Sequence, residues 1–287
     1  MIIYVNGEYV REEEARISPF DHGFLYGMGL FETIRMYNGF PFLLSDHLDR
    51  LQQSLKSLYI EFDLDYKEIR IIIERLLHLN QLKNARIRLN VTAGEGPVGL
   101  PAGPYKCVKV IIFISSLPEA QKNIEERRAR FLELRRNSPE GPYRLKSHHY
   151  GNNIAAKMEL QGEKGVEGLF LDKEGAVAEG IASNIFWVSE GRLFTPDLET
   201  GILPGITRQF IKLLAAKKGI PFEEGIYPAN TLRQASEVFL TNSIQEIVAI
   251  KQIEGIGVYK GSAGPVAQQL FQSYQRNREK LLSVNQL

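Results

Sequence analysis

Two Asn-Gly pairs constrain the fold of the N-terminal part of this chain more strongly than any other feature of its sequence. Asn-Gly favours the type I′ turn of tight β-hairpins, because both central residues of that turn take a positive φ angle. The pairs are Asn6-Gly7 and Asn38-Gly39, and they separate β-forming runs at 2–5 and 8–10 and at 31–37 and 40–44. The sequence therefore predicts two β-hairpins near its start.

The spacing of apolar residues predicts helices and further strands in the rest of the first half. Leucines recur at helical spacing after Ser45, a good N-cap, and predict a helix that reaches about Tyr59. A second helix is expected at 66–79, and β-rich runs at 85–92 and 107–115 flank a Gly/Pro-rich loop at 94–104. This half is therefore α+β.

The length of 287 residues exceeds that of a typical single domain, so two domains are expected. Segment 119–130 is charged and lacks apolar periodicity, which is typical of an interdomain linker. We therefore predict a small N-terminal α/β domain at 1–118 and a larger C-terminal domain at 131–287. In the second half, strands are expected at 130–135, 168–171, 184–188, 237–240 and 247–253, and helices at 147–162, 207–218 and 265–282.

The balance of charges argues against a polyanionic partner. Lys and Arg number 35 and Asp and Glu number 34, so no nucleic-acid partner is expected. The sequence shows neither a signal peptide nor an apolar run of about 18 residues, so we expect no membrane association and a cytoplasmic location. The single cysteine, Cys107, agrees with a reducing compartment and is expected to be a buried strand thiol. No metal site is predicted.

Two segments contain polar groups that could bind a ligand. Gly205-Ile206-Thr207-Arg208 opens a helix, where unpaired N–H groups and a hydroxyl could hold a phosphate, although plain helix capping is the commoner use of this pattern. Thr241-Asn242-Ser243 follows an apolar run, and such polar clusters either contact ligands or form turns. Both alternatives stay open for each segment.

Several separated motifs together resemble one enzyme family. The motifs are Asp21 to Gly27, Phe31-Glu32-Thr33-Ile34-Arg35, His47 to Leu51, Arg144 to Tyr150, Ala178 to Gly180, Ser183 to Phe186, Thr195-Pro196 and Gly201 to Arg208. In order and spacing they resemble the fold-type IV pyridoxal-phosphate enzymes: branched-chain aminotransferases, D-amino-acid aminotransferases and aminodeoxychorismate lyases. The resemblance covers nearly the whole chain. It implies a two-domain fold of the α+β / α/β class, pyridoxal 5′-phosphate as cofactor in the C-terminal domain, and a homodimer.

The resemblance also implies roles for individual residues. Lys146 matches the catalytic lysine that binds the cofactor covalently and transfers protons, and Glu179 matches the carboxylate that meets the pyridine nitrogen. Arg50 matches the arginine that grips the phosphate. Further phosphate contacts are implied for Ile206, Thr207, Asn242 and Ser243. Tyr150 is implied as a partner of the ring hydroxyl, although aminotransferase relatives often carry that tyrosine where this chain has Gly151.

Two positions discriminate between the members of the family. Branched-chain aminotransferases carry glycine at the position of Thr33, and D-amino-acid aminotransferases carry an arginine at the position of Ala93, whereas lyases resemble this chain in having threonine at the first. The resemblance is therefore to the aminodeoxychorismate lyases of Bacillus-type bacteria. Thr33 is implied as a catalytic hydroxyl, and an ordinary β-branched strand residue is the alternative.

The implied reaction is cleavage of 4-amino-4-deoxychorismate to 4-aminobenzoate and pyruvate in folate biosynthesis. D-amino-acid or branched-chain amino transfer on the same fold remains the alternative. The substrate is a dicarboxylate, so basic and polar side chains near the motifs are candidates for binding it. These candidates are Tyr26, Arg35, Arg88 and His148.

Overall fold

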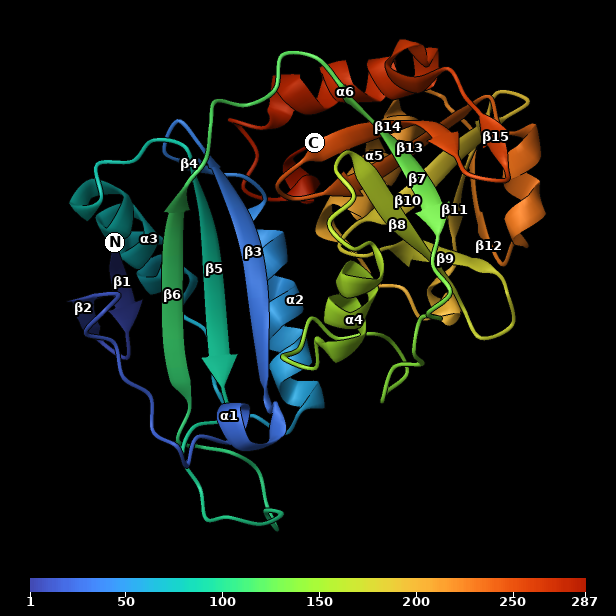
Figure 1. Cartoon of the computed structure of the whole chain (residues 1–287). Helices are drawn as coiled ribbons and strands as arrows, with labels where there is room; N and C mark the ends of the chain where they lie inside the picture. The colour runs from blue at the N-terminus through green and yellow to red at the C-terminus, as the bar shows by residue number, and fades with distance from the viewer. The chain divides into compact units, whose positions relative to one another are not determined.

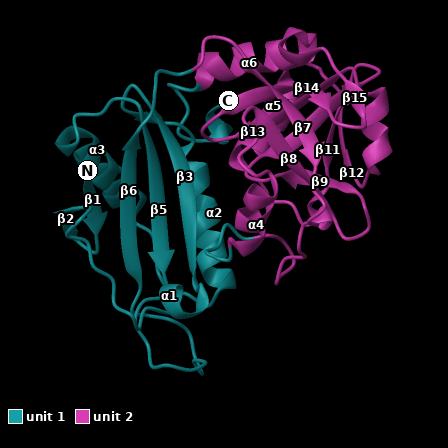
Figure 2. Cartoon of the chain, in the orientation of Figure 1, with its two compact units in different colours: residues 1–120, 145–149, 278–287 teal, residues 121–144, 150–277 magenta.

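The computed structural model describes all 287 residues and divides them into two compact units (Figure 2). Unit 1 contains residues 1–120, 145–149 and 278–287, and unit 2 contains residues 121–144 and 150–277. The longest helices have 14 residues, and none combines the length and hydropathy that a bilayer-spanning helix requires.

Unit 1 contains a six-stranded antiparallel sheet in the order β2-β1-β6-β5-β3-β4 (Figure 1). Its strands are β1 (Ile2–Val5), β2 (Glu8–Arg11), β3 (Gly29–Tyr37), β4 (Phe40–Pro41), β5 (Ala85–Thr92) and β6 (Lys109–Ser116). Both predicted hairpins are confirmed, and Asn6 and Asn38 have φ angles of 47° and 49°. The second hairpin is shorter than predicted, because the chain turns into a helix at Leu44.

Two helices cover one face of this sheet (Figure 1). They are α2 (Leu44–Ser57) and α3 (Tyr66–Leu79), and a short helix, α1 (His22–Tyr26), precedes β3. The leucines of α2 and the isoleucines of α3 pack against the apolar residues of β3, β5 and β6 that point to this side. The opposite face of the sheet carries the alternate side chains of each strand.

The start of α2 differs from the prediction, because Ser45 is not its N-cap. Leu43 occupies that position with a φ angle of 54° and no side-chain cap. The C-terminal segment 278–287 supplies the partners instead: the N–H groups of Leu43 and Ser45 donate to the carbonyls of Leu281 and Leu282, each at 2.9 Å. The buried carboxylate of Asp46 in turn accepts from the N–H of Val284 at 2.9 Å.

Cys107 was expected to be a buried strand thiol, and this prediction is wrong. The cysteine is exposed, because β6 begins two residues later at Lys109. Its carbonyl lies against Gly94, where a Cβ atom would overlap it. The loop from Gly94 therefore shapes the backbone around Cys107, and a strand begins only beyond that contact.

Unit 2 is built on a nine-stranded mixed sheet in the order β12-β11-β10-β13-β14-β7-β8-β9, with β15 paired to β14. The strands are β7 (Glu125–Phe131), β8 (Val166–Leu171), β9 (Val177–Gly180), β10 (Asn184–Ser189), β11 (Arg192–Pro196), β12 (Phe222–Gly225), β13 (Glu237–Asn242), β14 (Glu246–Ile253) and β15 (Gly257–Val258). The neighbours of β7, which are β14 and β8, both run parallel to it.

Three helices belong to unit 2: α4 (Gly151–Glu159), α5 (Ile206–Lys217) and α6 (Pro265–Asn277). Helices α5 and α6 pack on each other and on β13 and β14, and an edge-to-face pair of Phe210 and Tyr274 joins them. A second core, around the fully buried Trp187, fills the other side of the sheet. Short 3-10 helices lie at Leu198–Thr200, Ala229–Gln234, Gly261–Ala263 and, in unit 1, Val284–Gln286.

The division into units differs from the predicted boundaries of 1–118, 119–130 and 131–287. Residues 125–130 of the expected linker belong to β7, an inner strand of the large sheet, so the strand predicted at 130–135 begins earlier. Residues 145–149 and 278–287 return to unit 1. The helices predicted at 147–162 and 265–282 are therefore shorter, since α4 begins at Gly151 and α6 ends at Asn277.

Candidate functional site

Lys146 lies in a short extended segment, residues 145–149, which we call the lysine strap. The strap pairs with the first part of β3: the N–H of Phe31 donates to the carbonyl of Lys146, and the N–H of His148 donates to the carbonyl of Gly29, each at 2.9 Å. Leu30 and Ser147 form the antiparallel bridge between these two bonds. The backbone from the carbonyl of Lys146 to His148 is therefore fixed to β3.

Two glycines make room for the histidines of the strap. A Cβ atom on Gly29 would lie 2.5 Å from the His148 ring, and one on Gly27 would lie 2.6 Å from the His149 ring. Gly27 also has a φ angle of 69°, a conformation that favours glycine. The Gly-Met-Gly sequence that leads into β3, residues 27–29, is thus required for the close approach of the strap.

The ring of Phe31 is the centre of a cluster of basic side chains. The Nζ atom of Lys146 lies 4.5 Å from the ring centroid, and the guanidinium carbon of Arg88 lies 3.6 Å from it. The ring of His148 stacks on Phe31 with centroids 6.3 Å apart and planes at 27°. Cation–π attraction holds both cations near the ring, although like charges repel. We call these four residues the Phe31 cluster; the sequence reasoning did not single out Phe31 itself.

In this cluster, His148 has a ring nitrogen that could still form a hydrogen bond. Its Nε2 atom is buried without a hydrogen-bond partner. Burial lowers the pKa of His148 to about 4, the charge of Arg88 adds to this shift, and Asp21 opposes it. The imidazole is therefore neutral near pH 7. A buried ring nitrogen without a partner is a group that a bound ligand can satisfy.

Thr33 lies on the same face of β3 as Phe31, because side chains alternate along a strand. It is half-buried and stands directly opposite Arg88 in the β3–β5 register. Arg35 stands two pairs further along, opposite Arg86. Its guanidinium lies 5.0 Å from the Tyr37 ring and donates to the carbonyl of Pro118 at 3.4 Å. The structure thus groups Thr33 with the Phe31 cluster and engages Arg35 elsewhere.

Tyr26 is engaged with the loop that follows β5. Its hydroxyl accepts from the N–H of Gly99 at 2.7 Å, and its ring meets that of His22 edge to face. His22 also lies within hydrogen-bond distance of the Pro97 carbonyl, at 3.0 Å. Tyr26 therefore helps to hold the loop at 94–104 against α1.

Arg50 belongs to a buried ion network on the helix-covered side of β3. Its Nε and Nη2 atoms donate to the two carboxylate oxygens of Glu32, each at 2.7 Å, and Nδ1 of His47 lies 2.7 Å from the same carboxylate. Burial alone would raise the pKa of Glu32, but the charges and hydrogen bonds of Arg50 and His47 lower it to about 2. Burial lowers the pKa of His47, so this imidazole is a neutral donor. The network fixes the plane of the Arg50 guanidinium.

We expect Glu32→Gln to destabilise the protein by about 3–5 kcal/mol, because removing one partner of a buried ion pair leaves the other charge uncompensated. The stabilisation from Glu32 is fully present above its ordinary pKa of 4.5 and is lost as the pH falls toward 2. Denaturant unfolding between pH 7 and pH 3 measures both effects. Glu74→Gln breaks an exposed pair with Arg70 and should cost less than about 1 kcal/mol. Equal losses in the two variants would contradict this account.

Glu179, in β9 of unit 2, is a buried carboxylate with a full set of partners. Nε of Arg136 donates to it at 2.9 Å, the N–H of Leu203 at 3.0 Å and Nδ2 of Asn184 at 3.4 Å. Arg144 lies 4.0 Å away. Only 5% of Glu179 is exposed, which makes it a preorganised anion rather than a solvated loop acid.

The start of α5 has the features of an anion cradle. Its N-cap is Gly205, which offers no side-chain cap, and a Cβ atom there would overlap the amide oxygen of Asn184. Thr241, paired with Asn184 in the β10–β13 register, is 2% exposed, and its hydroxyl has no partner. A helix N-terminus together with a buried, unpartnered hydroxyl fits a phosphate group. Ile206 and Thr207 form the first turn of this helix.

Asn242 uses its side chain within its own turn. Its oxygen accepts from the N–H groups of Ile244 and Gln245, at 3.0 and 2.8 Å, so the amide closes the turn between β13 and β14. Ser243 lies in this turn, and Tyr150 is the N-cap of α4. The sequence predicted phosphate contacts for Asn242 and Ser243 but not for Thr241, whose buried hydroxyl has no hydrogen-bond partner.

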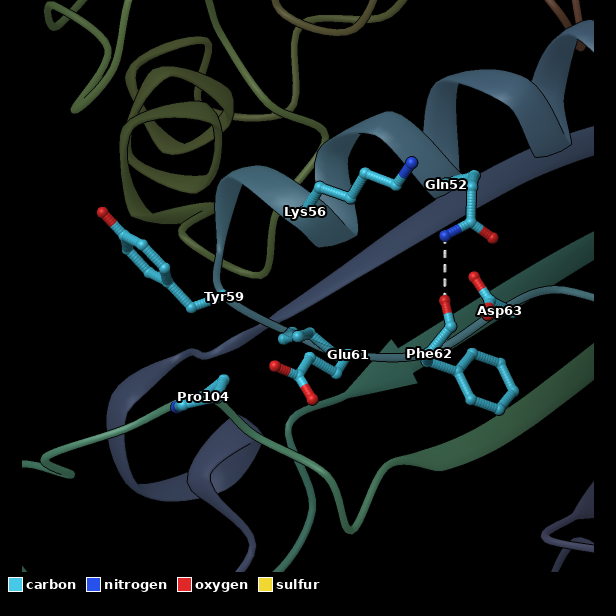
Figure 3. A pocket seen from close by; sticks show the side chains of 8 residues that line it. Gln52, Lys56, Tyr59, Glu61, Phe62, Asp63 and Pro104 are labelled. Carbon is cyan, nitrogen blue, oxygen red and sulfur yellow. Dashed lines mark hydrogen bonds between the residues drawn. The ribbon is translucent and has the colours of Figure 1, made fainter.

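A groove of about 510 Å³ lies elsewhere in unit 1, at the end of α2 (Figure 3). It contains none of the residues predicted from the sequence. The amide nitrogen of Gln52 donates to the carbonyl of Phe62 at 2.8 Å, and Glu61 pairs with Lys106. Gln52 and Glu61 are thus already engaged, and the groove is not the candidate site.

The donor groups of unit 2 fit a phosphorylated pyridine: a buried carboxylate can pair with a ring nitrogen, and the start of α5 can hold a phosphate. Unit 1, taken by itself, holds a lysine amine beside an aromatic ring. Comparison with known proteins agrees. The family model for class IV amino-transferases matches residues 29–253.

Two curated relatives cover nearly the whole chain. The aminodeoxychorismate lyase of Bacillus subtilis is 45% identical over 96% of this chain and 95% of its own length. A Methanocaldococcus jannaschii protein provisionally named branched-chain-amino-acid aminotransferase is 38% identical over 98% of this chain and 97% of its own.

Solved structures of branched-chain aminotransferases share the fold. The Thermoproteus uzoniensis enzyme with norvaline has a TM-score of 0.86, with 31% identity over 96% of this chain and 94% of that one. A second branched-chain aminotransferase, solved with pyridoxamine 5′-phosphate, also has a TM-score of 0.86, with 29% identity over 97% of this chain and 94% of that one.

Proposed function

Because this chain belongs to the class IV aminotransferase family of pyridoxal-phosphate enzymes, we propose that it is a lyase that converts 4-amino-4-deoxychorismate to 4-aminobenzoate and pyruvate. The observation that carries the proposal is Thr33, whose hydroxyl stands opposite Arg88 on the strand face where Phe31 holds the amine of Lys146. Branched-chain aminotransferases, by the resemblance above, have no hydroxyl at this position.

The proposed cofactor roles are those that the resemblance to the family implies for these residues. Lys146 would bind pyridoxal 5′-phosphate covalently, and Glu179 would face its ring nitrogen. Arg50 and the first turn of α5, at Ile206 and Thr207, would hold the phosphate together with the turn at Asn242 and Ser243, and Tyr150 would meet the ring hydroxyl. When bound, the cofactor captures the substrate amine and withdraws the electron pair of the C–H bond that breaks.

The chain's own residues would perform the proton transfers. In the proposed reaction, the amine of Lys146 removes the proton from C4 of the substrate, since lysine can act as a base once it is uncharged. The hydroxyl of Thr33 positions that amine or a water molecule. The bond to the enolpyruvyl oxygen then breaks, the oxygen keeps the electron pair, and the ring becomes aromatic. Lys146 afterwards returns to its resting position.

Carboxylate recognition would fall to the polar members of the Phe31 cluster. Arg88 supplies a guanidinium that can bind a carboxylate in a bidentate manner. His148 supplies a neutral ring whose Nε2 atom lacks a partner. Tyr26 and Arg35 remain further proposals, although Arg35 already contacts Tyr37 and Pro118.

Amino transfer is the second candidate function. It uses the same lysine and cofactor and differs only in the fate of the proton and the amino group, and the similarity to the Methanocaldococcus jannaschii protein favours it. Purified protein with bound cofactor should be incubated with aminodeoxychorismate, and separately with pairs of D- or L-amino acids and keto acids. Formation of 4-aminobenzoate supports the lyase; amino transfer without it would replace the lyase by the aminotransferase.

We expect the hydroxyl of Thr33 to matter chiefly in the transition state. Thr33→Ala should therefore lower kcat for 4-aminobenzoate formation by about 10²-fold with little change in KM, whereas Thr33→Ser should retain much of the activity. Thr92→Ser, at the far end of the β3–β5 pairing, is the control for a hydroxyl-preserving change. A Thr33→Ala enzyme with wild-type kcat would reduce Thr33 to a strand residue.

We also propose a homodimer in the cytoplasm that takes part in folate biosynthesis. The dimer is implied by resemblance to the family, whose active sites lie near a subunit interface. Sedimentation should give about twice the chain mass of 32.5 kDa at micromolar concentration. A fully active species with the mass of one chain would contradict this proposal.

A further inference from the structure

Asn90 is a buried asparagine on the same face of β5 as Arg88. Strand β5 lies between β3 and β6 (Figure 1), and side chains two residues apart on a strand point to the same side. In the β3–β5 register, Asn90 stands directly opposite Phe31. Only 6% of Asn90 is exposed. The sheet thus places a buried polar side chain beside the Phe31 cluster, and such a side chain requires hydrogen-bond partners.

Both ends of the Asn90 amide contact Arg88. The Oδ1 atom accepts from Nε of Arg88 at 3.2 Å, and the Nδ2 atom donates to the backbone carbonyl of Arg88 at 3.4 Å. The opposite orientation of the amide would bring two N–H groups together and two oxygens together, so these contacts favour a single orientation. The amide therefore ties the guanidinium of Arg88 to the backbone from which it extends.

These contacts restrict the rotation of the Arg88 guanidinium. Nε, at one corner of the planar group, is held by Asn90, and the Phe31 ring lies 3.6 Å from the central carbon. A planar group that is held at one corner and on one face has little freedom to turn. Its terminal edge, formed by Nη1 and Nη2, therefore has a defined direction. A carboxylate can bind such an edge through two parallel hydrogen bonds.

Asn90 orients Arg88 without adding a counter-charge. An amide oxygen accepts from a guanidinium but does not neutralise it, whereas a carboxylate in the same place would form an ion pair. The charge of Arg88 also acts on His148: burial lowers the pKa of this histidine, and Arg88 adds to the effect. Arg88 therefore contributes positive charge to the Phe31 cluster, and an anion that binds there is attracted by it.

We propose, on the basis of the function proposed above, that Asn90 is a neutral positioning residue that orients Arg88 for binding one carboxylate of the substrate. Asn90 acts through Arg88 and does not contact the substrate itself. The contact that it supports is present both in the bound substrate and in the transition state. Loss of Asn90 should therefore weaken substrate binding more than it slows the chemical step.

The main test measures KM and kcat for Asn90→Ala, Arg88→Lys and the double variant. Lysine keeps the charge but lacks the planar group that Asn90 orients. Each single change should raise KM for aminodeoxychorismate about tenfold, while kcat changes less than about threefold. The double variant should show no rise in KM beyond that of Arg88→Lys, because Asn90 acts only through the guanidinium.

Asn90→Asp tests whether the amide must be neutral. The variant keeps an acceptor for Nε of Arg88, but it adds a negative charge that competes with the substrate carboxylate. KM should therefore rise by more than it does in Asn90→Ala. A KM below that of Asn90→Ala would contradict the role proposed for a neutral side chain.

Asn80→Ala is the matched control. Asn80 is an asparagine of the same unit that bonds to the N–H and the carbonyl of Ile2, at 2.8 and 2.9 Å. Its replacement should lower the midpoint of thermal unfolding and leave KM unchanged. If Asn90→Ala does not fold, Asn90→Thr carries the test, because a β-branched side chain suits a strand and lacks the amide.

Hydrogen exchange at Nε of Arg88 gives a measurement that does not depend on turnover. In protein labelled with nitrogen-15 arginine, this group is identified as the Nε signal that is absent from Arg88→Lys. Its exchange should be at least about tenfold faster in Asn90→Ala and unchanged in Asn80→Ala, because a hydrogen bond protects the N–H group.

An unchanged KM in folded Asn90→Ala would overturn the inference, and so would a further rise of KM in the double variant. If the wild-type protein forms no 4-aminobenzoate, the proposed function fails instead. The exchange rate then decides whether Asn90 holds Arg88, and the KM for amino acids in amino transfer decides whether that contact serves carboxylate binding.

Discussion

Lys146→Ala should form 4-aminobenzoate at least about 10⁴-fold more slowly than the wild-type enzyme. Removing the amine eliminates both the covalent attachment of the cofactor and the base that takes the substrate proton. The fold should survive, because Lys146 is attached to β3 through its backbone carbonyl and not through its side chain. Turnover by single-wavelength assay and thermal unfolding measure the two quantities on the same preparation.

Covalent trapping of the cofactor distinguishes the loss of cofactor attachment from the loss of catalysis. Borohydride reduction of the wild-type protein should fix the cofactor to a peptide that contains Lys146, and mass spectrometry should find no such adduct in Lys146→Ala. Lys106→Ala is the matched control, since Lys106 is a lysine of the same unit that is 70% exposed and pairs with Glu61. An adduct on another lysine in Lys146→Ala would show that the catalytic residue has been misassigned.

Glu179→Gln should lower turnover by about 10²–10³-fold while the cofactor remains bound. The substitution preserves the size of the side chain but removes the charge that would favour a protonated ring nitrogen. Stability should also fall, because Arg136 loses its carboxylate partner in a buried site. Initial rates and cofactor affinity should therefore be measured at a temperature at which the variant is folded.

Glu159→Gln is the matched control for Glu179→Gln. Glu159 is also a carboxylate of unit 2 with an arginine partner, and it accepts from the N–H groups of Glu133 and Leu134, at 2.8 and 3.1 Å. Its replacement should cost stability without a comparable loss of turnover. If the two variants lose turnover equally, or if Glu179→Gln keeps near-normal turnover, Glu179 is structural.

Local patterns predicted much of the secondary structure. Helix α3 and strand β5 begin and end where apolar spacing and β-forming residues indicated, because both elements pack against one face of a single core. The first part of strand β7 was assigned to a linker, since its sequence is dominated by charged residues. Those charges are neutralised by partners distant in sequence, such as Glu167 for Arg127, and no local pattern shows such partners.

The candidate site was predicted through motifs rather than through geometry. The spacing of His47 and Arg50 places them on one helix face, but only the fold shows that the carboxylate of Glu32 lies between them. Arg136 gave no signal in the sequence, because an arginine in a charged segment resembles a solvated surface residue. Its role depends on Glu179, 43 positions further along.

Residues 278–287 follow unit 2 in the sequence but belong to unit 1, and this affects the order in which the two units can fold during synthesis. These residues are synthesised after all of unit 2, and α2 lacks the partners of its first turn until Leu281, Leu282 and Val284 have been made. Unit 2 is continuous in sequence apart from the five residues of the lysine strap. We therefore expect unit 2 to be able to complete its core first, whereas unit 1, which begins to emerge earlier, must wait for residues 278–287.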